Sequence, residues 1–116
     1  MKTVERRLAA ILVADMEEYS RLMHEDERGT LSEWRNTREE VIKPTIDKHF
    51  GKILKNTGDG FVAEFSAVSG AVECAVAMQA LLIERNKERT DAPDLKFRMG
   101  INLGDITIDE DVFYGD

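Results

Sequence analysis

The apolar positions of this chain follow several spacings, and each spacing predicts a different element. Residues 8–14 form an uninterrupted apolar run, as expected for a central strand that is covered on both faces. A short helix is predicted after this run, starting near Ser20 with Leu22 and Met23 on its buried side. Residues 24–29 are polar and predict a connection.

A long amphipathic helix is predicted over residues 30–50, where apolar residues recur at three- and four-residue steps. Pro44 lies inside it and predicts a kink or the local loss of one hydrogen bond, and Gly51 is expected to end it. Trp34 is interpreted as a core residue or a dimer contact, with no catalytic role.

The second half of the chain predicts a hairpin, a helix and further strands. Residues 52–56 and 61–65 read as strands joined by the turn Thr-Gly-Asp-Gly at 57–60. Ser66 is a candidate N-cap for a helix with a buried stripe over 68–83. Residues 95–103 alternate like a strand, and Gly104-Asp105 predicts a turn into a strand at 106–108. This order fits an α+β, ferredoxin-like βαββαβ sheet with helices packed on one face.

Composition and charge exclude several classes of protein. The 116 residues with 42% apolar content indicate one domain with a modest core. No apolar run approaches the ~20 residues that span a bilayer, so we expect a cytoplasmic protein with no membrane segment. The lone Cys74 cannot form an intramolecular disulfide. The net charge of −7, with no basic patch, argues against a nucleic-acid partner.

Two aspartates are the candidate chemical groups. Asp15 follows the first apolar run, and Asp59 lies in the hairpin turn. Taken singly, an aspartate at such places is more often a helix cap or a turn former. If the first strand pairs with the hairpin, however, the carboxylates would approach one site from two sides. Magnesium favours a few carboxylates together with phosphate oxygens and water, so the pair suits divalent metals held against a triphosphate.

The same segments resemble the catalytic domain of class III nucleotidyl cyclases, particularly the bacterial adenylate cyclases. The matching pieces, in the order and at the spacing of that family, are RRLAAILVADMEEYSRLM at 6–23, GKILKNTGDGFVAEF at 51–65, AVECAVAMQ at 71–79 and FRMGINLGDI at 97–106. The likeness covers residues 5–116. It implies that residues 1–116 are the N-terminal part of a single cyclase catalytic domain, incomplete at its C-terminal side.

The resemblance also implies a reaction and a set of site residues. The reaction converts ATP to cyclic AMP and pyrophosphate by attack of the ribose 3′-hydroxyl on the α-phosphorus, in cyclic-nucleotide signal transduction. In this family the active site forms between two subunits, so a homodimer is implied. The implied residues are Asp15 and Asp59 for two Mg²⁺ or Mn²⁺ ions, the Met16 backbone for one metal, Glu17, Glu18, Tyr19 and Ser20 for the phosphates, and Lys55 and Asp111 for the base.

Three departures from the family pattern keep a second interpretation open. Glu18 stands where the family usually has glycine, and Val112 stands where a base-reading residue is expected, with Asp111 one step earlier. The family's transition-state asparagine and arginine would follow residue 116, so we expect residues 1–116 alone to be nearly inactive. The alternative is a degenerate cyclase-like module that dimerises or senses nucleotide without turnover. A diguanylate cyclase or polymerase-palm relative ranks lower, because no Gly-Gly-Asp-Glu-Phe run is present.

Overall fold

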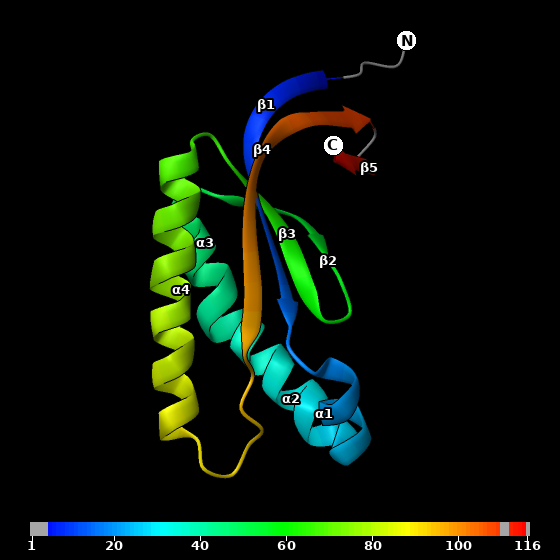
Figure 1. Ribbon diagram of the computed structural model, residues 1–116, viewed down its shortest axis with the longest axis vertical. Helices are drawn as coiled ribbons and strands as arrows, with labels where there is room; N and C mark the ends of the chain where they lie inside the picture. The colour runs from blue at the N-terminus through cyan, green and yellow to red at the C-terminus, as the bar shows by residue number, and fades with distance from the viewer. Residues whose placement is uncertain (1–4, 110–111, 116) are drawn as a thin grey trace.

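The sheet is the frame of the molecule in the computed structural model, which describes residues 5–109 and 112–115. Its strands are β1 (Glu5–Met16), β2 (Lys52–Asn56), β3 (Gly60–Phe65), β4 (Phe97–Asp109) and β5 (Val112–Gly115). They lie in the order β2-β3-β1-β4-β5, and every neighbouring pair is antiparallel (Figure 1). The α+β, ferredoxin-like arrangement predicted from the sequence is therefore confirmed.

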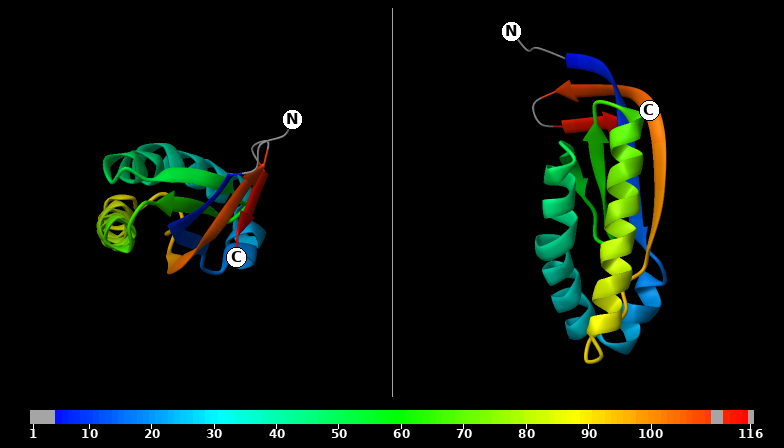
Figure 2. Two further views of the ribbon diagram at one scale, coloured as in Figure 1. Left: turned by 90° about the horizontal axis from the view of Figure 1, so that it is seen from above. Right: turned by 90° about the vertical axis from the view of Figure 1, so that its left-hand side faces the viewer.

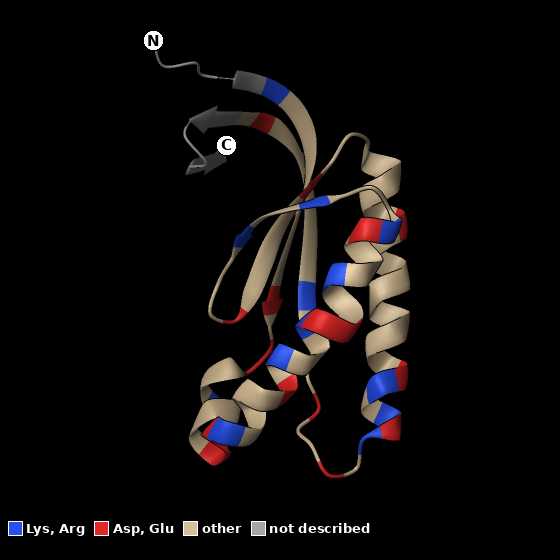
Figure 3. Cartoon of the chain, turned by 180° about the vertical axis from the view of Figure 1, so that it is seen from behind, with Lys and Arg blue, Asp and Glu red and all other residues tan. Residues whose placement is uncertain are grey.

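The helices pack on one face of this sheet. They are α1 (Tyr19–Glu25), α2 (Glu27–Thr37), the π-helical turn η1 (Arg38–Ile42), α3 (Lys43–Lys48) and α4 (Val68–Glu88). Figure 2 shows α3 and α4 side by side on the same side of the strands. Basic and acidic residues are interspersed along α1 to α3 and gather at the C-terminal end of α4 (Figure 3). Since only one face of the sheet carries helices, the other face is open to approach.

The two faces of β1 have different surroundings. Ala10, Leu12, Ala14 and Met16 alternate toward the helices and join the main buried core. On the opposite, helix-free face, which we call the open face, Ala9 and Ile11 meet Ile106 in a much smaller cluster. The predicted run at 8–14 is thus a strand, but it is longer than expected because β4 pairs with it from Met16 back to Glu5.

The first helix starts at Tyr19, close to the predicted Ser20, but the second helix begins earlier than the predicted residue 30. The polar connection predicted at 24–29 is wrong, because α1 ends at Glu25 and α2 starts at Glu27. Asp26 alone separates them, and its carboxylate accepts a hydrogen bond of 2.9 Å from the Gly29 N–H. Acidic N-caps favour helix starts, so this polar stretch is helical.

The long helix predicted over 30–50 is interrupted where Pro44 falls. A π-helical turn at Arg38–Ile42 precedes α3, and Pro44 occupies the first turn of α3, where its missing N–H costs little. The helix ends near Gly51, as predicted. The left-handed position belongs to Phe50 (φ 61°), and Gly51 donates to the Ile46 carbonyl at 2.9 Å.

Two further local predictions are wrong. The residue that caps α4 is Ala67 instead of Ser66, and it makes no side-chain cap bond. The turn predicted at Gly104-Asp105 does not form, because β4 continues through it and Asp105 pairs with Leu8 of β1. Asp111 lies outside the described residues. Within residues 5–109 and 112–115, no helix is long and apolar enough to cross a membrane.

Candidate active site

Asp15 stands near the end of β1 between two strands that flank it. Its cross-strand partners are Gly60 on β3 and Arg98 on β4. The alternation along β1 puts its side chain on the open face, where it is 45% exposed. Arg98 donates from Nε to Asp15 Oδ1 at 3.0 Å. The carboxylate is thus reachable from solvent and already has one cationic partner.

Asp59 is brought to the same edge by the hairpin turn. The Met16 N–H donates to the Asp59 carbonyl at 2.7 Å, which joins the turn directly to the end of β1. Within the turn, the Thr57 N–H donates to the Gly60 carbonyl at 3.0 Å, and the Thr57 hydroxyl lies 3.4 Å from Asp59 Oδ1. Directly opposed residues of an antiparallel pair have Cα atoms about 4.5–5.5 Å apart. Since Asp15 is opposite Gly60, Asp59 is its near neighbour.

Gly60 explains why the turn can approach β1 so closely. A Cβ built on Gly60 would lie 1.8 Å from the Ala14 carbonyl oxygen, so no side chain fits there. The glycine after Asp59 is therefore required by a backbone contact, independently of turn flexibility. The second glycine of the Gly-Asp-Gly sequence has this physical reason.

The oxygen donors at this edge of the sheet are few. No group of three or more His, Cys, Asp or Glu side chains that could hold a metal occurs in the described part of the chain. Asp15 and Asp59 would therefore supply only part of a coordination shell. Mg²⁺ usually keeps several waters and binds through one or two carboxylates plus substrate phosphates, so a two-carboxylate site of this kind fits it.

The segment after Asp15 turns away from the sheet at an unusual residue. The Glu17 N–H donates to the Lys96 carbonyl at 2.7 Å, and Glu18 adopts a left-handed conformation (φ 55°) just before α1. The preference for glycine at such a position has a steric basis, since only glycine adopts it without cost. Tyr19 is half-buried against the core and Ser20 is exposed.

The carboxylate of Glu18 is held by its own helix. Arg21 donates to it from Nη2 at 2.9 Å and from Nε at 3.2 Å, and also binds Glu25. The hydrogen bond and positive charge of Arg21 lower the pKa of Glu18 below its usual value. Glu18 therefore remains an anion in this segment, with its charge matched locally by Arg21.

Lys55 lies on the same open face as Asp15. It is exposed on β2 and pairs with Val62 of β3, which in turn faces Val13 of β1. Val13 and Asp15 are two residues apart, so they share a face. A β-bulge between Ile53 and Lys55 shifts the register here. The hairpin thus brings Lys55 to the face that carries Asp15, two residues before the turn at 57–60.

Two residues near the site were given no site role from the sequence, although Trp34 was expected in the core or at a dimer contact and is buried in the core. The Trp34 indole N–H donates to the Gly58 carbonyl in the Asp59 turn at 3.0 Å, although it is 24 residues away in the chain. Arg98 binds Asp15. Alternation along residues 95–103 puts Arg98 opposite in face to Phe97, but its pairing with Asp15 depends on the β1–β4 register, which the pattern does not give.

Comparison with known proteins adds sequence and fold relatives. A Rhizobium meliloti (strain 1021) protein named "Putative adenylate cyclase 3" is 40% identical over 119 aligned residues, which cover 99% of this chain. The solved adenylate/guanylate cyclase/hydrolase from Silicibacter pomeroyi is 39% identical and superposes with a TM-score of 0.86 over 98% of this chain. The chain is related in sequence and fold to the class III nucleotidyl cyclases. The guanylyl cyclase Cya2 shares the fold at 24% identity, with a TM-score of 0.78 over 97% of this chain.

The chain spans only part of the length of these relatives. It spans 20% of the length of the Rhizobium protein, 66% of the Silicibacter chain and 64% of the Cya2 chain. No protein-family model matches the chain. The resemblance to the nucleotidyl cyclases that the sequence motifs predicted is confirmed. The activity and the substrate of this protein are proposed below.

Proposed function

We propose that this chain supplies the metal-binding part of an adenylate cyclase, which converts ATP to 3′,5′-cyclic AMP and pyrophosphate. The observation that carries the proposal is the joining of Asp15 and Asp59 at one sheet edge through the 2.7 Å bond from the Met16 N–H to the Asp59 carbonyl. The sequence and fold likeness to cyclases supports the same conclusion. The complete protein is expected to carry the activity, and residues 1–116 alone to be nearly inactive.

The residues at this edge act by positioning and by charge. Asp15, Asp59 and the Met16 carbonyl would hold two Mg²⁺ or Mn²⁺ ions, whose chemistry is to neutralise phosphate charge and to favour ionisation of the attacking hydroxyl. Backbone amides of residues 18–20 would orient the triphosphate, while the Glu17 N–H is bonded to the Lys96 carbonyl. The ribose 3′ oxygen then bonds to the α-phosphorus as the α–β bridging bond breaks. The hydroxyl proton passes to solvent, and pyrophosphate leaves.

Base selection is assigned to Lys55 and Asp111. A lysine ammonium can only donate hydrogen bonds. Adenine N1 accepts a hydrogen bond whereas guanine N1 carries a hydrogen, so a lysine at this edge of the base favours adenine and ATP is the proposed substrate. In a homodimer whose sites lie between subunits, Lys55 of one protomer serves the site that holds the metals of its partner. The position of Lys55 on the open face supports this arrangement, because that face is free of helices.

A second candidate function follows from Glu18. Its carboxylate adds negative charge to the segment proposed to meet the phosphates, which favours a degenerate module that dimerises or senses nucleotide without turnover. Calorimetric titration of the full-length protein with a non-hydrolysable ATP analogue and Mn²⁺ separates the candidates. A cyclase should bind the analogue in a metal-dependent way, whereas a degenerate module should bind weakly or without regard to metal.

The metal role is tested with Asp59→Asn in the full-length protein. Cyclic AMP formation should fall about a hundredfold or more, because removing groups that stabilise transition-state charge has effects of this size. Mn²⁺ affinity, followed by calorimetry, should fall as well, with an unchanged circular dichroism spectrum. Asp47→Asn, at an exposed residue of α3, is the matched control. Unchanged Mn²⁺ affinity and activity in Asp59→Asn would refute the proposal.

A further inference from the structure

Trp34 is buried beneath the candidate site and touches two of the segments that form it. The side chain is 3% exposed, and its indole N–H donates to the Gly58 carbonyl at 3.0 Å. Its ring lies 5.1 Å from the ring of Phe97, centroid to centroid, at 45°. Phe97 is the cross-strand partner of Met16, next to Asp15. The indole therefore joins the Asp59 turn to the start of β4 just beneath the end of β1.

The hydrogen bond to Gly58 reaches this turn from a residue 24 positions away. Among the described residues, the turn is also held by its own Thr57–Gly60 bond, by the bond from Met16 and by the hydrogen bond from the Thr57 hydroxyl to Asp59 Oδ1. Gly58 has open space around it, since a Cβ built there meets no atom within 4 Å. A small residue without side-chain packing gives the turn little rigidity of its own. The indole N–H thus supplies an anchor that the turn sequence lacks.

The indole ring of Trp34 is also covered by a residue four positions later in the chain. The Arg38 guanidinium lies over the ring at 4.3 Å from the centroid, and Arg38 belongs to the π-helical turn that follows α2. π-Helical turns are frequent at functional sites. Here the widened turn coincides with the residue that covers Trp34.

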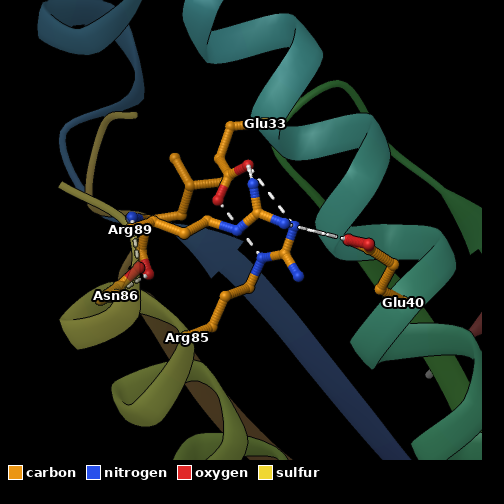
Figure 4. Close-up of polar contacts among 6 residues, drawn as sticks. Glu33, Glu40, Arg85, Asn86 and Arg89 are labelled. Atoms are coloured by element: carbon orange, nitrogen blue, oxygen red, sulfur yellow. Dashed lines mark hydrogen bonds and ion pairs between the residues drawn. The ribbon is translucent and has the colours of Figure 1, made fainter. Parts of the chain in front are cut away.

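The neighbouring residue anchors α2 to α4. Glu33 is 3% exposed and pairs with Arg85 at 3.2 Å and with Arg89 at 3.4 Å, while Arg85 also pairs with Glu40 at 2.7 Å (Figure 4). Asn86, in the same group, binds both the N–H and the carbonyl of Leu95 in the segment that leads to Phe97. A buried, hydrogen-bonded ionic cluster of this kind can define a unique packing. Trp34 therefore extends from a helix whose position is already fixed.

We propose that Trp34 is a positioning residue for the metal site, acting through Gly58 on the placement of the Asp59 carboxylate. This inference rests on the proposed metal role of Asp59. In the absence of the indole N–H, the Gly58 carbonyl loses its anchor, and Asp59 samples orientations that do not match the Asp15 carboxylate. Partners that orient metal ligands commonly change metal affinity by 10–100-fold when they are removed.

The sharpest test replaces Trp34 by benzothienylalanine in the full-length protein, since this analogue keeps the bicyclic ring and has sulfur in place of the N–H. Trp34→Phe is the second variant, which removes the donor and part of the ring. Mn²⁺ affinity measured by calorimetry without nucleotide should fall about tenfold in both. Hydrogen exchange at the Thr57 and Met16 amides should accelerate, with little change at central-strand amides such as Leu12.

The control and the reference separate the possible outcomes. Thr45→Val removes another buried side-chain donor, the hydroxyl that binds the Val41 carbonyl, and should leave Mn²⁺ affinity unchanged. If Asp59→Asn loses Mn²⁺ binding but the benzothienylalanine protein binds like wild type, the positioning role is wrong and the proposed function stands. If Asp59→Asn binds Mn²⁺ normally, the proposed function is wrong, and the positioning role of Trp34 is wrong with it. Uniformly faster exchange throughout the sheet would assign Trp34 a purely structural role and overturn the inference.

Discussion

Asp15 pairs with an arginine that would compete with a metal ion for its carboxylate. Its carboxylate accepts a hydrogen bond from Arg98 at 3.0 Å, and both side chains are substantially exposed, at 45% and 69%. A metal ion that binds Asp15 must compete with this guanidinium for the same oxygen lone pairs. Exposed ion pairs contribute only about 0–1 kcal/mol, so we expect Arg98 to weaken the proposed metal binding without preventing it.

Arg98→Met should therefore strengthen Mn²⁺ binding in the absence of nucleotide. The expected gain is up to about fivefold, since the ion pair that must be broken contributes about 0–1 kcal/mol. Calorimetric titration of the full-length protein measures it. Arg35→Met, at an exposed arginine of α2, controls for the general loss of one positive charge. If Arg98→Met binds Mn²⁺ more weakly than this control, Arg98 supports the site and does not compete with the metal.

The residues of the candidate site differed in how far the sequence could reveal them. Asp15 and Asp59 could be found because each follows a local signal, the end of an apolar run and a glycine-flanked turn. Arg98 and Trp34 could not be assigned a role in this way. Their contacts are with residues 83 and 24 positions away, and such contacts depend on strand register and helix packing. A lone tryptophan in an amphipathic pattern gives the same signal whether or not its N–H has a partner.

At the scale of elements, the sequence predicted type and order better than boundaries. The hairpin at 52–65 and the helix over 68–83 formed as expected because glycine turns and a regular apolar stripe are local signals. The predicted turn at Gly104-Asp105 failed because pairing with β1 overrides a local turn preference. The helix start at Glu27 was missed because charged residues are also good first-turn residues.

Cys74 links α4 to α3 and gives this packing a pH dependence. Its side chain is fully buried, with Sγ 3.8 Å from the Thr45 carbonyl, and burial raises the pKa of the thiol to about 11. Above a pH of about 9, the unfolded chain releases the thiol proton while the folded chain retains it. The contribution of Cys74 to the free energy of unfolding is therefore fully present below about pH 9. It decreases by up to about 1.4 kcal/mol per pH unit as the pH rises toward about 11.

Comparison with Cys74→Ala isolates this contribution. Urea unfolding of both proteins at several pH values should show wild type losing its stability advantage as pH rises from about 9 toward about 11. Lysine and tyrosine ionisation affects both proteins alike and cancels in the difference. A difference that stays constant over this window would mean that the folded state does not hold the thiol neutral.

At the scale of the whole molecule, the sheet divides its roles between two faces. The helix-covered face holds most of the buried residues, from Leu12 to Phe97, and explains stability. The open face carries Asp15, Lys55 and the partly exposed Val13, which is 46% exposed. One molecule thus carries the two carboxylates proposed to bind metal and the lysine proposed to read the base on a surface without helices. Such a surface suits a site completed by a second copy.

Lys55 and Asp15 lie on strands of one protomer that are not neighbours. β3 separates β2 from β1, and two strand spacings come to about 10 Å. In a symmetric dimer, each of the two equivalent sites would take Asp59 from one protomer and Lys55 from the other. Replacing Asp59 then removes the group that one protomer supplies to a site, and replacing Lys55 removes the group that the other protomer supplies.

Mixing such variants tests the shared site directly. Full-length Asp59→Asn and Lys55→Glu proteins should each be inactive alone, because both sites of each homodimer lack one essential group. After mixing and subunit exchange, half of the dimers are mixed and each has one intact site, so activity should recover to about a quarter of the wild-type rate. Adding Val13→Lys to both variants should block recovery by placing like charges on the open face, with an unchanged circular dichroism spectrum. Recovery that persists with Val13→Lys would place the dimer contact elsewhere, and no recovery despite subunit exchange would mean that Lys55 and Asp59 serve the same site within one protomer.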